Sequence, residues 1–178
     1  MEEKEIIRHV DHTQLKPFAA WEDIEKLCEE ALKFNTASVC IPPCYVKRVH
    51  QKYGGRLKIC TVVGFPLGYS VTEAKVEETR KALEDGADEI DMVINISDVK
   101  NGDYDKVTQE IISVKRECLN HILKVIVETC YLTEKETADG SKEIEEQVSD
   151  FLIRIGSEIY LLECQSYDDG SMAIRIAE

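Results

Sequence analysis

The chain has 178 residues, of which 43% are hydrophobic and 32% charged, and its formal net charge is −13. This composition is typical of one globular domain, and the negative charge argues against a general affinity for nucleic-acid backbone or an anionic membrane. No apolar run approaches the roughly 18 residues of a membrane span, no signal-peptide pattern opens the chain, and the seven cysteines form no CxxC pair, so we expect a cytoplasmic protein.

Helical and strand-like patterns alternate along the chain as far as residue 129. The expected helices each carry an apolar face and span 21–34, 43–53, 71–84 and 103–118. The expected strands are largely apolar and span 9–17, 37–41, 58–65, 89–96 and 122–129. Capping-box pairs, Ser70 with Glu73 and Thr133 with Glu136, indicate where two helices begin.

Apolar strands that alternate with amphipathic helices predict a parallel sheet covered by helices, so the fold class is α/β. The spacing of the strands suits either a (β/α)₈ TIM barrel or a doubly wound sheet. Neither GxGxxG nor GxxxxGK[ST] occurs at a strand–helix turn, which argues against nucleotide binding.

The alternation changes after about residue 137. Residues 141–155 have helical spacing, although 151–155 equally suit a strand, and an Asp-Gly turn between 158–165 and 171–178 predicts a β-hairpin. We therefore predict a first domain over residues 1–136 and a divergent tail over 137–178, formed by a helix and a β-hairpin.

Polar residues near the strand ends are the candidates for chemistry, because this end of a β/α barrel carries the active site. Asp91 and Lys124 lie on neighbouring expected strands in otherwise apolar runs, so we expect a buried pair with movable pKa values. A lysine that attacks a carbonyl and an acid that moves protons are what a Schiff-base enzyme needs. Glu89, near the start of the same strand, is expected at the opposite, structural end of the barrel. Further candidates at strand ends are Asp11, His12, Thr13, Lys16, Cys40, Thr61, Asn95, Glu128 and Thr129.

Simpler interpretations stand beside these. The Asp91–Lys124 pair suits a purely structural ion pair as well. His9 and His12 are candidate metal ligands, but ordinary hydrogen bonds suit them better, because the other two histidines fall on or near helices. Cys40 is either a small core residue or part of a pocket lining.

Several stretches occur in one order between about residues 6 and 136: "VDHTQLKP", "ASVCIPPCYV", "CTVVGFPLG", "GADEIDMVINI" and "LKVIVETCYLT". With them the chain resembles the deoxyribose-phosphate aldolase family. The resemblance implies a TIM barrel and a class I aldolase, a lyase that cleaves 2-deoxy-D-ribose 5-phosphate to D-glyceraldehyde 3-phosphate and acetaldehyde. The reaction proceeds through a lysine imine, with no metal or other cofactor. A small phosphorylated sugar and further copies of the chain are the implied partners, with no nucleic acid or membrane.

Carried over by position, the resemblance assigns Asp91 as proton donor and acceptor and Lys124 as a lysine of the pocket. It assigns substrate binding to Asp11, Thr13 and Cys40.

The resemblance also shows what the chain lacks. The family's Schiff-base lysine belongs to a KTSTG motif, which is absent, and no lysine follows Lys142. We therefore expect an incomplete barrel of about five β/α units with impaired catalysis. Lys124 as a substitute nucleophile and a non-catalytic fusion remnant are the alternatives.

The tail has a resemblance of its own. Residues 149–178 are similar to PD-(D/E)XK nuclease-like transposase-family proteins, which implies that Asp150, Glu163 and Gln165 bind Mg²⁺. An unrelated acid-bearing hairpin is the alternative. The net charge of −13 argues against a nuclease, because affinity for nucleic acid rests on neutralising phosphates.

Overall fold

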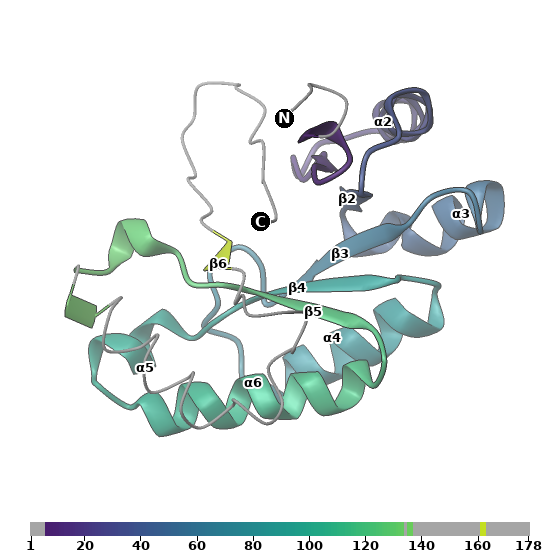
Figure 1. Ribbon diagram of the computed structural model, residues 1–178. Coiled ribbons are helices and arrows are strands. Elements are labelled where there is room, and N and C mark those ends of the chain that lie inside the picture. Colours follow the sequence, from purple (N-terminus) through teal and green to yellow (C-terminus); the bar gives the residue numbers. More distant parts are fainter. Residues whose placement is uncertain (1–5, 134, 137–160, 163–178) are drawn as a thin grey trace.

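Parallel strands form one sheet in the order β1-β2-β3-β4-β5-β6 (Figure 1). The computed structural model describes residues 6–133, 135–136 and 161–162. The strands are β1 Asp11–Thr13, β2 Ser38–Ile41, β3 Ile59–Val63, β4 Glu89–Val93, β5 Ile122–Ile126 and β6 Leu161–Leu162. The helices are α2 Trp21–Phe34, α3 Pro43–Tyr53, α4 Thr72–Glu84, α5 Ile96–Lys100 and α6 Tyr104–Cys118, with a 3₁₀ turn, η1, at Thr129–Tyr131.

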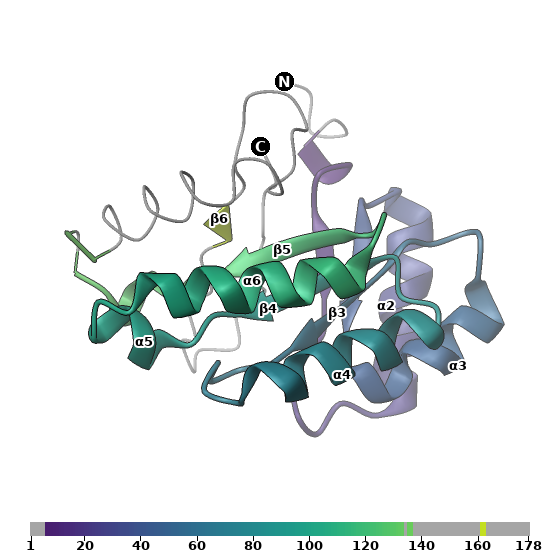
Figure 2. The ribbon, with the colours of Figure 1, turned by 90° about the horizontal axis from the view of Figure 1, so that it is seen from below.

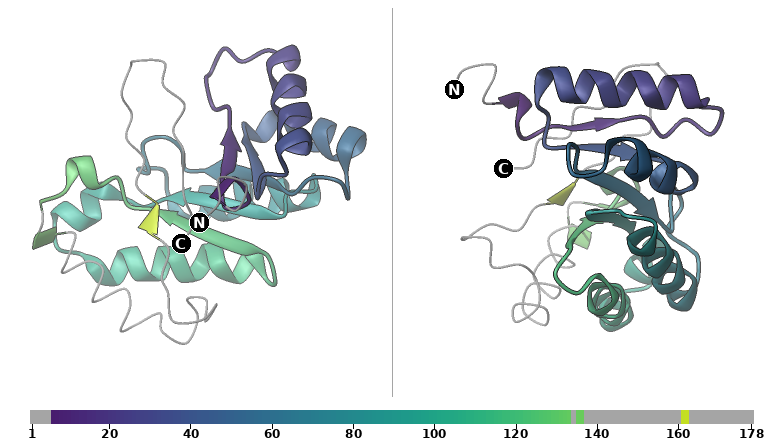
Figure 3. Two further views of the ribbon diagram at one scale, coloured as in Figure 1. Left: turned by 45° about the horizontal axis from the view of Figure 1, so that its top comes forward. Right: turned by 90° about the vertical axis from the view of Figure 1, so that its right-hand side faces the viewer.

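The strands follow one another in sequence order, and the sheet curves with α2, α3, α4 and α6 on its convex side (Figures 2 and 3). A doubly wound sheet would instead reverse its strand order and carry helices on both faces. The observed order and the one-sided helices are those of a β/α barrel wall. The predicted α/β class is confirmed, and of the two predicted architectures the observed sheet fits the incomplete barrel. Leu161–Leu162, within the predicted antiparallel hairpin, instead pair in parallel with β5, and the rest of that hairpin lies outside the described residues.

Both faces of the sheet are buried, which explains why the strands are largely apolar. The main core lies between helices and sheet and includes Ile24, Val39, Ile90 and Ile111. The concave face carries smaller apolar clusters, which are Cys40, Cys60 and Val62, and Val93 and Ile126, with Phe65 packed against both.

The helix boundaries test the capping predictions. The Ser70–Glu73 capping box is wrong: α4 begins at Thr72 after the N-cap residue Val71, with no side-chain cap. Glu73 still lies in the first turn, where its charge favours the helix dipole.

The Thr133–Glu136 capping box is confirmed. The Thr133 amide donates to Glu136 Oε2 at 2.8 Å, and the Glu136 amide donates to Thr133 Oγ1 at 3.2 Å. Within the part of the chain that the structure describes, no helix combines the length and the apolar character needed to cross a membrane.

Candidate active site

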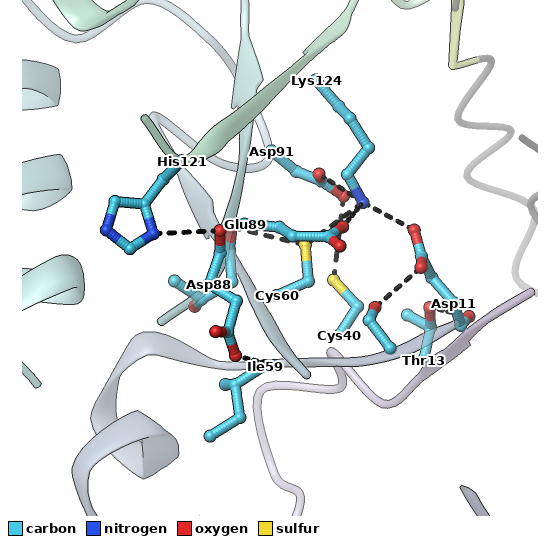
Figure 4. A network of polar contacts seen from close by, with 12 residues as sticks. Asp11, Thr13, Cys40, Ile59, Cys60, Asp88, Glu89, Asp91, His121 and Lys124 are labelled. Atoms are coloured by element: carbon cyan, nitrogen blue, oxygen red, sulfur yellow. Dashed lines mark hydrogen bonds and ion pairs between the residues drawn. The ribbon is translucent and has the colours of Figure 1, made fainter. Parts of the chain in front are cut away.

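Lys124 is the centre of a buried polar cluster on the concave face (Figure 4). Its Nζ lies 2.6 Å from Asp11 Oδ2, 3.0 Å from Asp91 Oδ1 and 3.2 Å from Glu89 Oε2. The exposed fraction of these side chains is 9% for Lys124 and 0% for Asp91. One ammonium is therefore shared by three carboxylates from β1 and β4, almost out of contact with water.

The acidic groups decide the charge state of the lysine. Burial by itself would lower the pKa of Lys124, but the acidic groups packed around its ammonium raise that pKa above its ordinary value. Burial raises the pKa of Glu89, and the charge of Lys124 only partly opposes this effect. Lys124 is thus held as an ammonium ion, and Glu89 is the carboxylate of the cluster that burial drives toward its protonated form.

Strand register explains why these groups meet. Asp91 on β4 is directly opposite Lys124 on β5, so the predicted neighbouring pair is observed. Both residues lie in the middle of their strands rather than at the predicted strand ends. Asp11 reaches Lys124 from β1, although 113 positions separate the two residues.

Glu89 is the first residue of β4, as predicted, but the prediction that it lies apart from the candidate site is wrong. Side chains alternate along a strand, so Glu89 and Asp91, two positions apart, face the same side of β4. The Glu89 carboxylate therefore reaches the same ammonium as Asp91 does (Figure 4).

Two thiols complete the cluster. Cys40 Sγ lies 3.9 Å from Asp91 Oδ2, and Lys124 Nζ donates to Cys60 Sγ at 3.4 Å. Cys40, Cys60 and Asp91 lie close enough together to be ligands of one metal ion. A metal ion would bind these cysteines as thiolates, whereas burial raises the pKa of the Cys60 thiol and so favours its neutral form. The Lys124 ammonium already supplies a positive charge beside Cys60 and Asp91. These donors therefore fit an ammonium better than a metal ion.

Asp11 and Thr13 are positioned by local hydrogen bonds. Ser38 Oγ on β2 donates to Asp11 Oδ1 at 2.7 Å, which leaves the other carboxylate oxygen for Lys124. Thr13 Oγ1 donates to the Asp11 carbonyl oxygen at 2.8 Å. Sequence reasoning did not select Ser38, although a serine one strand away from a buried acid is a signal for such a partner.

Other candidates from the strand ends have different partners. His12 pairs with Glu30 on α2 at 2.9 Å, as its ordinary hydrogen-bonding interpretation predicts. Thr61 donates to the carbonyl oxygen of Ile41, a backbone contact between strands. The Asn95 side chain accepts from the Ser97 amide and caps α5. Lys16 is exposed.

The tail residues Asp150, Glu163 and Gln165 lie outside the described residues. Their assignment as Mg²⁺ ligands, and with it the nuclease resemblance of residues 149–178, stays a prediction.

A buried lysine with acidic groups around its ammonium can take part in acid–base chemistry, and the curved parallel sheet that carries it is the wall of a β/α barrel. Comparison with known proteins makes this specific. The family model described as DeoC/LacD family aldolase matches residues 6–160. The chain belongs to this aldolase family.

Curated relatives and solved structures agree with the family. A deoxyribose-phosphate aldolase from Clostridium botulinum (strain Alaska E43 / Type E3) is 60% identical over 152 residues, which cover 85% of this chain and 69% of that protein. The crystal structure of a Coccidioides immitis protein described as a deoxyribose-phosphate aldolase superposes with a TM-score of 0.78 at 36% identity, covering 83% of this chain and 58% of that one. A deoxyribose phosphate aldolase from Aeropyrum pernix, described as having a unique tetrameric structure, superposes with a TM-score of 0.68 at 28% identity. The superposition covers 79% of this chain and 61% of that one.

These matches bear on the extent of the chain. It spans about two thirds of the length of the Clostridium relative and less of the solved structures. The family match also continues across the boundary predicted at residues 136–137. The division into a domain of 1–136 and a tail of 137–178 stays a prediction.

Proposed function

We propose that this chain serves the deoxyribose-phosphate aldolase reaction and provides its acid–base groups. The substrate is 2-deoxy-D-ribose 5-phosphate, and the products are D-glyceraldehyde 3-phosphate and acetaldehyde. The observation that carries the proposal is the Lys124 ammonium, 3.0 Å from Asp91 and 2.6 Å from Asp11, in a cluster where none of these three side chains is more than 9% exposed. The 60% identity to a curated aldolase supports it.

Class I aldol cleavage needs an amine that has condensed with the substrate aldehyde, and a group that moves protons. A base takes the proton of the C3 hydroxyl, the C2–C3 bond breaks, and its electron pair enters the iminium ion to form an enamine. Protonation at C2 and hydrolysis then release acetaldehyde and the amine. We assign the proton transfers to Asp91, because its charge is coupled to a neighbouring ammonium.

Lys124 is assigned as the pocket cation rather than the imine-forming amine. A lysine attacks a carbonyl only as the neutral amine, whereas the acidic groups around Lys124 raise its pKa and hold it protonated. Lys75, the other buried lysine among the described residues, contacts Glu110 on α6 instead. Asp11, Thr13 and Cys40 are assigned to the wall of the substrate site.

The test supplies the nucleophile from outside. Methylamine condenses with the open-chain aldehyde of 2-deoxyribose 5-phosphate, and released acetaldehyde is followed by NADH oxidation with alcohol dehydrogenase. We expect the parent chain to cleave the methylamine-treated substrate at least ~100-fold faster than Asp91→Asn, since positioned acid–base groups contribute about that factor or more. The matched control is Lys52→Met, because the Lys52 side chain is exposed on α3. Its cleavage rate should equal that of the parent. Equal rates in the parent and Asp91→Asn would overturn the proposal.

We further propose that the chain assembles with copies of itself in a reducing, cytoplasmic setting. The tetrameric structure described for the Aeropyrum relative supports the assembly. The buried cysteines Cys28, Cys40, Cys60 and Cys118, which form no disulfide among the described residues, support the reducing setting. Light scattering on the purified chain tests the assembly, and a monomer at micromolar concentration would contradict it.

A further inference from the structure

A second buried ion pair lies on the convex side of the sheet. Lys75 on α4 is 0% exposed, and its Nζ lies 2.8 Å from Glu110 Oε1 on α6. The two helices pack side by side beneath the sheet (Figure 2). A buried ion pair contributes little net stability compared with apolar residues of similar size, so stability alone does not account for this one.

The pair is joined to the end of the Asp91 strand by hydrogen bonds. Lys75 Nζ donates to the Val93 carbonyl oxygen at 2.8 Å, and Glu110 Oε2 accepts from the Asn95 amide at 3.2 Å. Val93 is the last residue of β4 and lies two positions beyond Asp91. One lysine–glutamate pair therefore holds the last carbonyl group of β4 and the amide of Asn95, two positions beyond the end of the strand.

The same lysine also contacts the end of β3. Gly64 has φ +60°, and a Cβ added there would lie 2.7 Å from Lys75 Cε, so the lysine stem occupies the space of a side chain. The Gly64 amide donates to Glu78 Oε2 on α4 at 2.7 Å. At Gly68, with φ +70°, an added Cβ would lie 1.9 Å from the Ile94 carbonyl oxygen. The loops after β3 and β4 thus pack closely against each other, and the loop after β3 also contacts α4.

We propose that Lys75 is a positioning residue for the aldol reaction, and that with Glu110 it fixes the carboxyl ends of β3 and β4 and thereby the placement of Asp91. The effect on turnover rests on the proposed function. The contact between Glu110 and the Asn95 amide is independent of the proposed function, so it is measured separately.

The test replaces the pair by apolar residues of similar volume. K75M/E110L removes both charges, and such replacements of buried pairs are often neutral for stability. Here, however, we expect a cooperative thermal melt with a midpoint below that of the parent, because the Val93 carbonyl and the Asn95 amide lose their partners. Exchange of the Asn95 amide hydrogen should become at least ~10-fold faster, since its acceptor is gone. In the methylamine assay kcat should fall ~10-fold or more with KM unchanged, because a misplaced catalytic group reduces the rate of the chemical step.

The matched control is R80M/E117L. Arg80 Nε and Glu117 Oε1 also join α4 to α6, at 3.0 Å, but this pair is partly exposed. Among the described residues, neither side chain bonds to a strand end. It should leave Asn95 exchange and kcat unchanged.

The outcomes separate the two proposals. Asn95 exchange and kcat equal to the parent's in folded K75M/E110L would overturn the positioning role. If the parent shows no turnover, the proposed function fails, and Asn95 exchange alone decides the role of Lys75. If K75M/E110L does not fold, K75M/E110M, whose unbranched methionine is close in length to Glu110 and also removes the acceptor of the Asn95 amide, is measured by the same exchange experiment. Parent-like exchange there overturns the role as well.

Discussion

Replacing Lys124 by methionine is expected to produce a large loss of stability that depends on pH. The change removes the only ammonium in contact with Asp11, Glu89 and Asp91 among the described residues, and leaves three carboxyl groups in a buried space. Methionine fills much of the volume of the lysine stem, so the main effect is electrostatic.

The magnitude follows from the distances. A unit-charge contact at about 3 Å and an effective dielectric constant of about 20 is worth about 5 kcal/mol, and Lys124 makes three such contacts. Desolvation of the four groups offsets most of this sum. Removing one partner of a buried ion cluster is therefore expected to destabilise the fold by about 3–5 kcal/mol near neutral pH.

The pH dependence has a definite sign. Burial already raises the pKa of Glu89 with the lysine present, and without the opposing charge of Lys124 the pKa of Glu89 in the folded state rises further. Raised folded-state pKa values give stability at acid pH that is lost as the pH rises through them. Lys124→Met should therefore lose most stability at about pH 7 and less at about pH 5.

The assay is urea unfolding of the parent and Lys124→Met at both pH values, with Lys52→Met on the surface as the control. A loss below about 1 kcal/mol at neutral pH, the size typical of an exposed pair, would refute the buried cluster. A larger loss at acid pH than at neutral pH would refute its charge balance.

Two further changes test other parts of the fold. Gly68→Ala should lower stability by about 2 kcal/mol or more, because its φ is +70° and the new Cβ would lie 1.9 Å from the Ile94 carbonyl oxygen. Gly102→Ala, at φ +74° in open space, is the control and should cost about 1 kcal/mol by thermal melting. Glu89→Gln tests the raised pKa of Glu89, whose stabilising proton is bound at acid pH and lost as the pH rises. The uncharged glutamine should flatten the decline in urea midpoint between about pH 5 and pH 7, and an unchanged slope would count against a raised pKa.

Local patterns predicted the elements well where one physical signal dominated. The apolar spacing of residues 21–34 and the segment 43–53 gave the boundaries of α2 and α3. The short helix α5 was missed, because the apolar run 89–96 was interpreted as one strand although Asn95, a favoured N-cap residue, interrupts it.

The candidate site was predictable in part. Asp91 and Lys124 stand out as charged residues in apolar strands, and adjacent strands bring them together. The position of Glu89 on the same face of β4 as Asp91 could have been predicted, because side chains alternate with a period of two along a strand. The contact of Asp11 with Lys124 could not, because it depends on the curvature of the whole sheet, which no local pattern encodes.

The contacts of Lys75 were also beyond the sequence. A lysine on an amphipathic helix is expected in water, and its burial arises only when α4 and α6 pack against the end of β4. Its proposed role depends on the backbone groups of Val93 and Asn95. Because every residue carries such backbone groups, the residue types at these positions do not predict the bonds.

The most direct test of the account is borohydride trapping of the chain with acetaldehyde, followed by peptide mass mapping. A full-length curated relative treated in parallel shows that the conditions capture an imine. The account predicts that Lys124 remains unmodified, because the surrounding acidic groups keep it protonated and it serves as the partner of Asp91. A reduced adduct on Lys124 would contradict the account and make this lysine the nucleophile.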